Sequence, residues 1–172
     1  MMVVMLLIGV FATVFLPRMF RRSPAVEWKT IADELNNLVA FARQEAIANQ
    51  KVYRLVFKRN PNAADTVSVE EEAPHPEKPG RVIYKSVSSY YFSTTYRLAD
   101  AVKLKAVYLG KQEMFEELRG VAYCFVIHDG LVQDVLVQLE RRINNIETIA
   151  SFKMNPFLGR FGLHEGVLKP ER

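Results

Sequence analysis

The chain opens with an apolar stretch that would cover every face of a helix. Residues 1–16 contain no charged side chain, and Arg18 is the first. A helix of this length spans about 24 Å, somewhat less than the roughly 30 Å hydrocarbon core of a bilayer. A helix that is apolar all round is typical of a membrane span. The pattern therefore predicts a membrane helix over residues 1–17. Its members are Val3, Val4, Leu6, Leu7, Ile8, Gly9, Val10, Phe11, Val14, Phe15, Leu16 and Pro17.

A secretory signal peptide is the alternative interpretation of this segment. Such a signal has a basic region before its apolar run and a cleavage site between small residues after it. Here Met1 leads straight into apolar residues, and the sequence FLPRMFRR closes the run. These features favour the membrane span over the signal peptide.

The next pattern is an amphipathic helix. Pro17 and Pro24 interrupt a helix, and beyond them apolar residues recur every three or four positions. The spacing predicts a kink followed by an amphipathic helix within residues 18–50, with its apolar face packed on a sheet. The predicted packing residues are Trp28, Ile31, Leu35, Leu38, Ala42 and Ala46.

From residue 51 the pattern alternates with a period of two, as in strands. Residues 51–59, KVYRLVFKR, place Tyr53, Leu55 and Phe57 on one face. Residues 81–98 are rich in β-branched and aromatic side chains. We therefore expect residues 51–172 to form a globular β-rich domain, which gives an α+β fold with the long helix packed on an antiparallel sheet.

Two connections in this domain have clear turn chemistry. Asp129-Gly130 separates two β-rich runs, 121–127 and 131–139, and predicts a hairpin with a type I′ turn in which both runs join the same sheet. Residues 60–80 are acidic and contain four prolines, which predicts a variable loop with Glu70–Glu72 in solvent.

Charge and composition exclude several functions. Of the 23 basic and 19 acidic residues, three arginines and no acid lie in the first 22 positions, so the remainder of the chain is nearly neutral. That balance gives little reason to expect nucleic-acid binding. The single cysteine, Cys124, cannot form an intramolecular disulfide, and it shares a strand face with Val126, so we expect a packed thiol.

No pattern points to catalysis. The sequence has no phosphate-binding glycine loop, no dinucleotide fingerprint and no serine in a nucleophile elbow. The three histidines, His75, His128 and His164, are far apart and form no pair at ligand spacing. We therefore expect a protein that is not an enzyme and that holds no cofactor or metal.

Three stretches resemble the type IV pilin-like superfamily, which includes the pseudopilins of type II secretion. VVMLLIGVFATVFLP, with Gly9 and Pro17 eight residues apart, is similar to the N-terminal helix of that family. LNNLVAFARQEAIANQKVYRLVF (35–57) resembles the H-type minor pseudopilins and related minor pilins, and NPFLGRFGLHEG (155–166) resembles the family's approach to its final strand.

The resemblance implies a structural role. It implies a minor pseudopilin of a type II secretion system that contributes to the assembly or the tip of the periplasmic pseudopilus and to protein export. The protein would be held by a single span in a bacterial inner membrane with its domain in the periplasm. The implied partners are other pseudopilins or pilins through the N-terminal helix, a prepilin peptidase acting on the uncut precursor, and exported protein cargo. Aligning Gly9 and Pro17 with the family places its characteristic Glu immediately before Met1. We therefore expect a basic leader, a Gly and an FTLIE-like segment upstream.

Two other functions remain open. A related minor pilin that takes part in DNA uptake would use basic residues of the C-terminal segment to contact phosphates. An unrelated β domain on a single-span anchor is the second, because Arg18, Arg21 and Arg22 follow the span and positive residues favour the cytoplasmic side. The candidate DNA contacts are Arg141, Arg142, Lys153, Arg160, Lys169 and Arg172.

Overall fold

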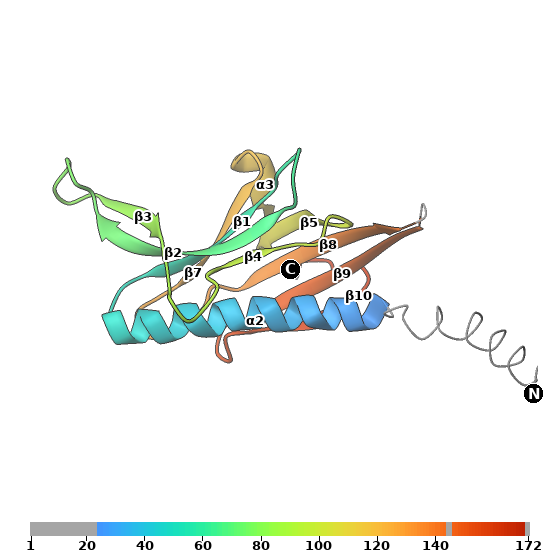
Figure 1. Ribbon diagram of the computed structural model, residues 1–172, viewed down its shortest axis with the longest axis horizontal. Helices are drawn as coiled ribbons and strands as arrows, with labels where there is room; N and C mark the ends of the chain where they lie inside the picture. The colour runs from blue at the N-terminus through green and yellow to red at the C-terminus, as the bar shows by residue number, and fades with distance from the viewer. Residues whose placement is uncertain (1–23, 144–145, 171–172) are drawn as a thin grey trace, which may run out of the picture.

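One long helix lies along two antiparallel sheets (Figure 1). The computed structural model describes residues 24–143 and 146–170, and the apolar helix predicted over residues 1–17 lies outside that range. Within the described residues, no helix combines the length and the apolar character needed to cross a bilayer. The fold is α+β, as the sequence predicts.

Helix α2 (Pro24–Asn49) is the amphipathic helix expected from the apolar spacing. Proline is well tolerated at its first turn, where the missing N–H would have no partner within the helix. Glu27 adds a negative charge near the positive end of the helix dipole. The helix ends where Gln50 adopts the left-handed conformation with φ of 52°, and the first strand follows almost at once.

The first sheet contains five strands in the order β3-β2-β1-β7, with β4 also paired to β2. All pairings are antiparallel, and Tyr53 of β1 lies opposite Glu71 of β2 on one side and Val126 of β7 on the other. The strands are β1 (Tyr53–Lys58), β2 (Thr66–Pro74), β3 (Val82–Ser86), β4 (Thr95–Arg97) and β7 (Val121–Val126).

The second sheet has the order β10-β9-β8-β5-β6 and is also antiparallel. A short helix, α3 (Met114–Glu117), connects it back to β7. Its strands are β5 (Val102–Leu109), β6 (Gln112–Glu113), β8 (Val135–Ile143), β9 (Ile146–Asn155) and β10 (Arg160–Glu165).

The Asp129-Gly130 turn is present, but it does not join two strands of one sheet. The N–H of Ile127 donates to the carbonyl of Leu131 at 3.0 Å, and the N–H of Gly130 donates to Ile127 at 2.8 Å. Gly130 alone in this turn has a positive φ, 83°, so the three-residue loop has the form of a type I turn with a G1 bulge. The type I′ prediction is therefore wrong, but a short hairpin is present, because Val132 pairs with Val126 and the N–H of Gln133 donates to the carbonyl of Phe125 at 2.9 Å. Beyond these contacts the chain enters the second sheet.

Strand β2 takes up residues 66–74 of the segment 60–80, all of which the sequence analysis predicts as a loop. Its inner face buries Val67 and Val69, which fits the alternation expected of a half-buried strand. Two of its acidic residues form ion pairs: Glu70 with Arg54 of β1 at 2.6 Å, and Glu71 with Lys51 at 3.7 Å. Glu70–Glu72 therefore belong to a sheet and are not a run in solvent.

The two sheets share one core and are joined by buried polar contacts. Asp65, only 2% exposed, accepts hydrogen bonds from the N–H groups of Asn60 at 2.8 Å and Leu104 at 2.7 Å. Arg59 donates to the carbonyls of Leu104, at 2.8 Å, and Lys105, where β5 is bulged against β8. These bonds link the β1–β2 connection to the second sheet, so α2 packs on a single rigid platform.

Candidate assembly surface

The predicted packing stripe of α2 lies inside the molecule. Trp28 meets Phe152 of β9 edge to face, with ring centroids 6.3 Å apart. A fully buried leucine or isoleucine side chain contributes roughly 1.5–3 kcal/mol. The buried stripe includes all six predicted residues, Trp28, Ile31, Leu35, Leu38, Ala42 and Ala46.

Two flanks of α2 border this stripe and differ in chemistry. On one flank Glu27, Glu34 and Phe41 follow each other at intervals of seven residues. On the other flank Asn36 and Arg43 have the same spacing. At 100° per residue the two flanks lie about 160° apart around the helix axis. Each flank contacts loops or turns of the β domain.

Asn36 fixes α2 to the edge of the second sheet. Its Oδ1 accepts the N–H of Phe161 at 2.7 Å, and its Nδ2 donates to the carbonyl of the same residue at 3.3 Å. The amide thus replaces a neighbouring strand at the outer edge of β10. An unpaired strand edge is a site of unwanted pairing, and covering it is a common solution.

Arg43 fixes two turns to the same flank. Its Nε donates to the carbonyl of Gly130 at 2.8 Å, and its Nη1 donates to the carbonyl of Leu158 at 2.7 Å. At Gly159, which has a φ of 60°, a β-carbon would lie 2.6 Å from Nη1 of Arg43. Glycine is therefore required there both by the backbone conformation and by the position of the arginine.

The turn held by Arg43, residues 156–159, presents apolar side chains to solvent. The Oδ1 of Asn155 accepts the N–H groups of Phe157 at 3.1 Å and Leu158 at 3.0 Å, which orders the turn. Phe157 is 79% exposed and Leu158 is 64% exposed. In Figure 1 the connection between β9 and β10 reaches past α2. We call residues 156–159 the β9–β10 turn.

The other flank of α2 receives a loop that interrupts an edge strand. Both backbone groups of Val69 are bonded across this interruption: its N–H donates to Thr94 at 2.9 Å, and its carbonyl accepts from Val87 at 3.3 Å. The hydroxyl of Thr94 donates to the carbonyl of Val87 at 2.6 Å and so joins the two ends of the loop. Strands β3 and β4 thus form one interrupted edge strand beside β2, and residues 88–93 form the loop between them.

This loop, called the tyrosine loop below (residues 88–93), lies against α2. Phe92 stacks on Phe41 with ring centroids 5.1 Å apart and planes 9° apart. Tyr90 and Tyr91, each 94% exposed, contact one another edge to face at 5.1 Å. In Figure 1 the connection between β3 and β4 passes over the C-terminal half of α2. The stacking of Phe92 on Phe41 therefore holds the loop against α2, while Tyr90 and Tyr91 project into solvent.

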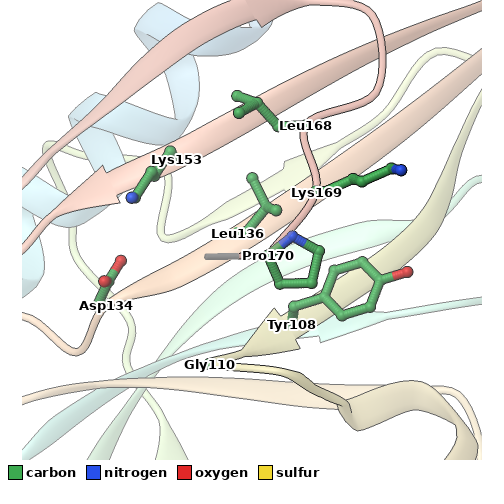
Figure 2. Close-up of a pocket in the computed structure, with 8 residues that line it drawn as sticks. All are labelled: Tyr108, Gly110, Asp134, Leu136, Lys153, Leu168, Lys169 and Pro170. Carbon is green, nitrogen blue, oxygen red and sulfur yellow. The ribbon is translucent and has the colours of Figure 1, made fainter. Parts of the chain in front are cut away.

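The six candidate DNA contacts do not form one patch. Arg141 pairs with Glu27 of α2 at 2.7 Å, and its side chain is only 12% exposed. Arg142 is exposed at the end of β8, while Arg160 begins β10 beside the β9–β10 turn. Lys153 and Lys169 line a small pocket on the second sheet (Figure 2). The sixth residue, Arg172, lies outside the described range.

That pocket is too small for a substrate or cofactor. It measures about 70 Å³, below the 300–1,000 Å³ typical of ligand sites. The C-terminal segment forms one of its walls and is held by Gln138, whose Nε2 donates to the carbonyl of Leu168 at 2.8 Å. Figure 2 shows the lining residues, which are Tyr108, Gly110, Asp134, Leu136, Lys153, Leu168, Lys169 and Pro170.

The residues with reactive side chains are dispersed. Cys124 is fully buried on the inner face of β7, and burial, with Asp134 nearby, raises the pKa of its thiol to about 12. His75 follows β2, His128 lies in the Asp129-Gly130 turn and His164 lies in β10. Across residues 24–143 and 146–170, no three His, Cys, Asp or Glu side chains are grouped as a metal site.

The sequence analysis did not identify several of these surface residues. Asn36 and Arg43 lie off the apolar stripe, and their partners are 125 and up to 115 residues away along the chain. The composition of residues 88–95, SSYYFSTT, could have indicated the tyrosine loop as a binding surface. Tyrosine and serine are enriched in the antibody loops that recognise other proteins.

A solved structure with the same architecture is the minor pseudopilin EpsH from the type 2 secretion system of Vibrio cholerae. The similarity has a TM-score of 0.51 at 12% sequence identity, and it covers 85% of this chain and 99% of the EpsH chain. No protein-family model matches the chain, and no curated protein matches it significantly. At this identity the likeness establishes the fold, which is pseudopilin-like.

Proposed function

We propose that the chain is a structural subunit of a type II secretion pseudopilus, a minor pseudopilin of H type. The observation that carries the proposal is the fold, which matches almost the whole EpsH chain. The resemblance of residues 35–57 to the H-type minor pseudopilins is the reason why the proposal names that type. On this proposal the protein performs no catalysis and works by contacts with other subunits.

The apolar stretch at residues 1–17 and the helix α2 would have different tasks. Residues 1–17 would lie in the inner membrane before assembly and in the filament core afterwards, in contact with the corresponding helices of other pseudopilins. Helix α2 would hold the β domain at a fixed angle, because Asn36 and Arg43 tie it to the second sheet and to two turns. The domain would lie in the periplasm, where it is available to other subunits and to exported proteins.

A role in DNA uptake has weaker support. Binding to phosphates needs several free cations on one surface. The pairing of Arg141 with Glu27 removes one candidate from that surface, and Arg142 lies away from the others at the end of β8. Lys153 lines one hollow with Arg160 and another with Lys169, so these three candidates alone lie near one another. The likeness to a secretion subunit also favours export over uptake.

A gene deletion in the source bacterium tests the proposed function. The proposal predicts that proteins exported by type II secretion accumulate inside the cell and that the complete gene restores their release. The control is the parent strain, which should release the same proteins normally. Normal export together with defective DNA uptake would contradict the proposal and favour the minor-pilin alternative.

A further inference from the structure

The two loops on α2 form a complementary pair of surfaces. The tyrosine loop and the β9–β10 turn are held at Phe41 and Arg43, two residues apart along the helix. They are therefore at the same level of the molecule but on opposite flanks of α2, about 160° apart. Each presents large side chains that are mostly exposed, Tyr90 and Tyr91 on one side and Phe157 and Leu158 on the other.

The surroundings of the two surfaces differ in charge. The flank of the tyrosine loop carries Glu34 and Glu45, which lie seven residues before and four after Phe41 on the same side of α2. The β9–β10 turn borders a surface hollow of about 540 Å³ that is lined by two basic residues, Lys153 and Arg160, and one acidic residue, Asp134. An acidic aromatic surface thus lies opposite a basic apolar one.

Two different complementary surfaces on one molecule produce head-to-tail contacts. A contact of this type uses one surface on each partner, leaves the other surface of each free, and extends into a row unless it closes into a ring. A self-complementary dimer would instead require each surface to match itself. Like charges facing each other disfavour that arrangement here, since Glu34 would meet Glu34.

We propose that the tyrosine loop of one copy packs against the β9–β10 turn of a second copy of this chain. Tyr90 and Tyr91 of the first copy contact Phe157 and Leu158 of the second, and Glu34 of the first lies near Arg160 of the second. The inference rests on the proposed function as a filament subunit, and it adds that this chain has neighbours on two sides. A subunit confined to the end of a filament needs only one such surface.

Cysteine crosslinking in membranes tests the contact directly. Two full-length copies with different tags are produced together, one carrying Ser88→Cys in the tyrosine loop and the other Leu158→Cys in the turn. Ser88 is exposed, and the substitution leaves both tyrosines in place. The natural Cys124 does not interfere, because it is fully buried and its thiol is hard to ionise. A short bis-maleimide is added and the two tags are followed on a gel.

The proposal predicts a crosslinked species carrying both tags, at least about fivefold more abundant than with Lys78→Cys in place of Ser88→Cys. Lys78 is exposed in the β2–β3 connection, so this control measures random collision. Adding Tyr91→Ser to the Ser88→Cys copy should lower the yield about threefold or more, because an aromatic contact is lost. Equal yields for Ser88→Cys and Lys78→Cys would overturn the proposal.

A charge exchange gives a second, independent criterion. Arg160→Glu in the Leu158→Cys copy should lower the yield about tenfold, and Glu34→Arg in the Ser88→Cys copy should restore most of it. No restoration, or efficient crosslinking between two Ser88→Cys copies, would overturn the head-to-tail arrangement. Crosslinking only to a different subunit would overturn the choice of a second copy. In both cases the secretion phenotype of the deletion is still expected, so the proposed function is tested separately.

Discussion

Asn36 and Phe161, 125 residues apart in the chain, are joined by two hydrogen bonds that fix α2 to the edge of a sheet. The side-chain amide offers a donor and an acceptor at the spacing of a strand's backbone. It therefore continues the ladder of β10 where no further strand follows. The ion pair between Glu27 and Arg141 of β8, at 2.7 Å, is a second polar contact between α2 and this sheet.

The first prediction concerns that contact. Asn36→Ala should lower the free energy of unfolding by about 1–3 kcal/mol, because both backbone groups of Phe161 lose their partner. Amide hydrogen exchange at Phe161 should also become faster. The control, Asn37→Ala, changes an exposed neighbour and should alter stability by no more than about 0.5 kcal/mol. Unchanged exchange at Phe161 would show that the bond is absent in solution.

The second prediction concerns the buried stripe of α2. In residues 25–172, which we expect to fold as a soluble domain, Leu38→Asp should cost several kcal/mol, because a charge would be buried without a partner. Asn37→Asp adds the same charge one position away, on the exposed side, and should have little effect. Thermal unfolding of both variants makes the comparison. Equal midpoints would contradict the packing of α2 on the sheets.

The third prediction separates backbone strain from steric overlap. Gly159 and Gly110 both have a φ of 60°, but only at Gly159 would a β-carbon meet another side chain, that of Arg43. Gly110→Ala should cost about 1–2 kcal/mol through its left-handed backbone. Gly159→Ala should cost about 1–3 kcal/mol more, because Arg43 must also move.

A double-mutant cycle tests the origin of that difference. In an Arg43→Ala background, the extra cost of Gly159→Ala over Gly110→Ala should largely disappear, since the overlapping side chain is gone. Denaturant unfolding of the Gly159→Ala and Gly110→Ala variants, each with and without Arg43→Ala, supplies the coupling free energy. An additive result would mean that Arg43 does not hold the β9–β10 turn.

The fourth prediction concerns alkaline pH. Burial raises the pKa of the Cys124 thiol from 9.0 to about 12, so above pH 9 the unfolded chain loses a proton that the folded chain keeps. Folding stability should therefore be fully present below pH 9 and should fall by up to about 1.4 kcal/mol per pH unit above it. Cys124→Ala should show a shallower decline between pH 9 and pH 10. Parallel curves for the two proteins would contradict the buried thiol.

Parts of the fold could be predicted because they depend on local periodicity. Helix α2 has an apolar arc that matches the helical period, and β1 alternates with a period of two, so both elements are visible in the sequence. Strand β2 was missed because the prolines and acidic residues of its segment suggested a loop. Pro74 is the last residue of β2 and the other prolines lie outside it, while Glu70 pairs with Arg54 and Glu71 pairs with Lys51.

The candidate surface was harder to predict because it depends on contacts distant in sequence. Nothing local to Arg43 shows that its guanidinium will bind the carbonyl of Leu158, and nothing local to Phe92 shows that it will stack on Phe41. The separation of the strands that flank Asp129-Gly130 into two sheets has the same cause. The turn chemistry is local, but the partners of β7 and β8 are chosen by the whole fold.

The accessibility of one engineered thiol tests whether the chain is a membrane-held subunit with its domain outside the cytoplasm. Lys78→Cys is exposed in the β2–β3 connection, while the natural Cys124 is buried and does not react until the protein unfolds. The chain is produced from its complete gene, and spheroplasts are treated with a membrane-impermeant maleimide. We predict labelling of Lys78→Cys in intact spheroplasts and recovery of the labelled protein in the membrane fraction. Labelling only after lysis would place the domain in the cytoplasm and contradict the proposed topology.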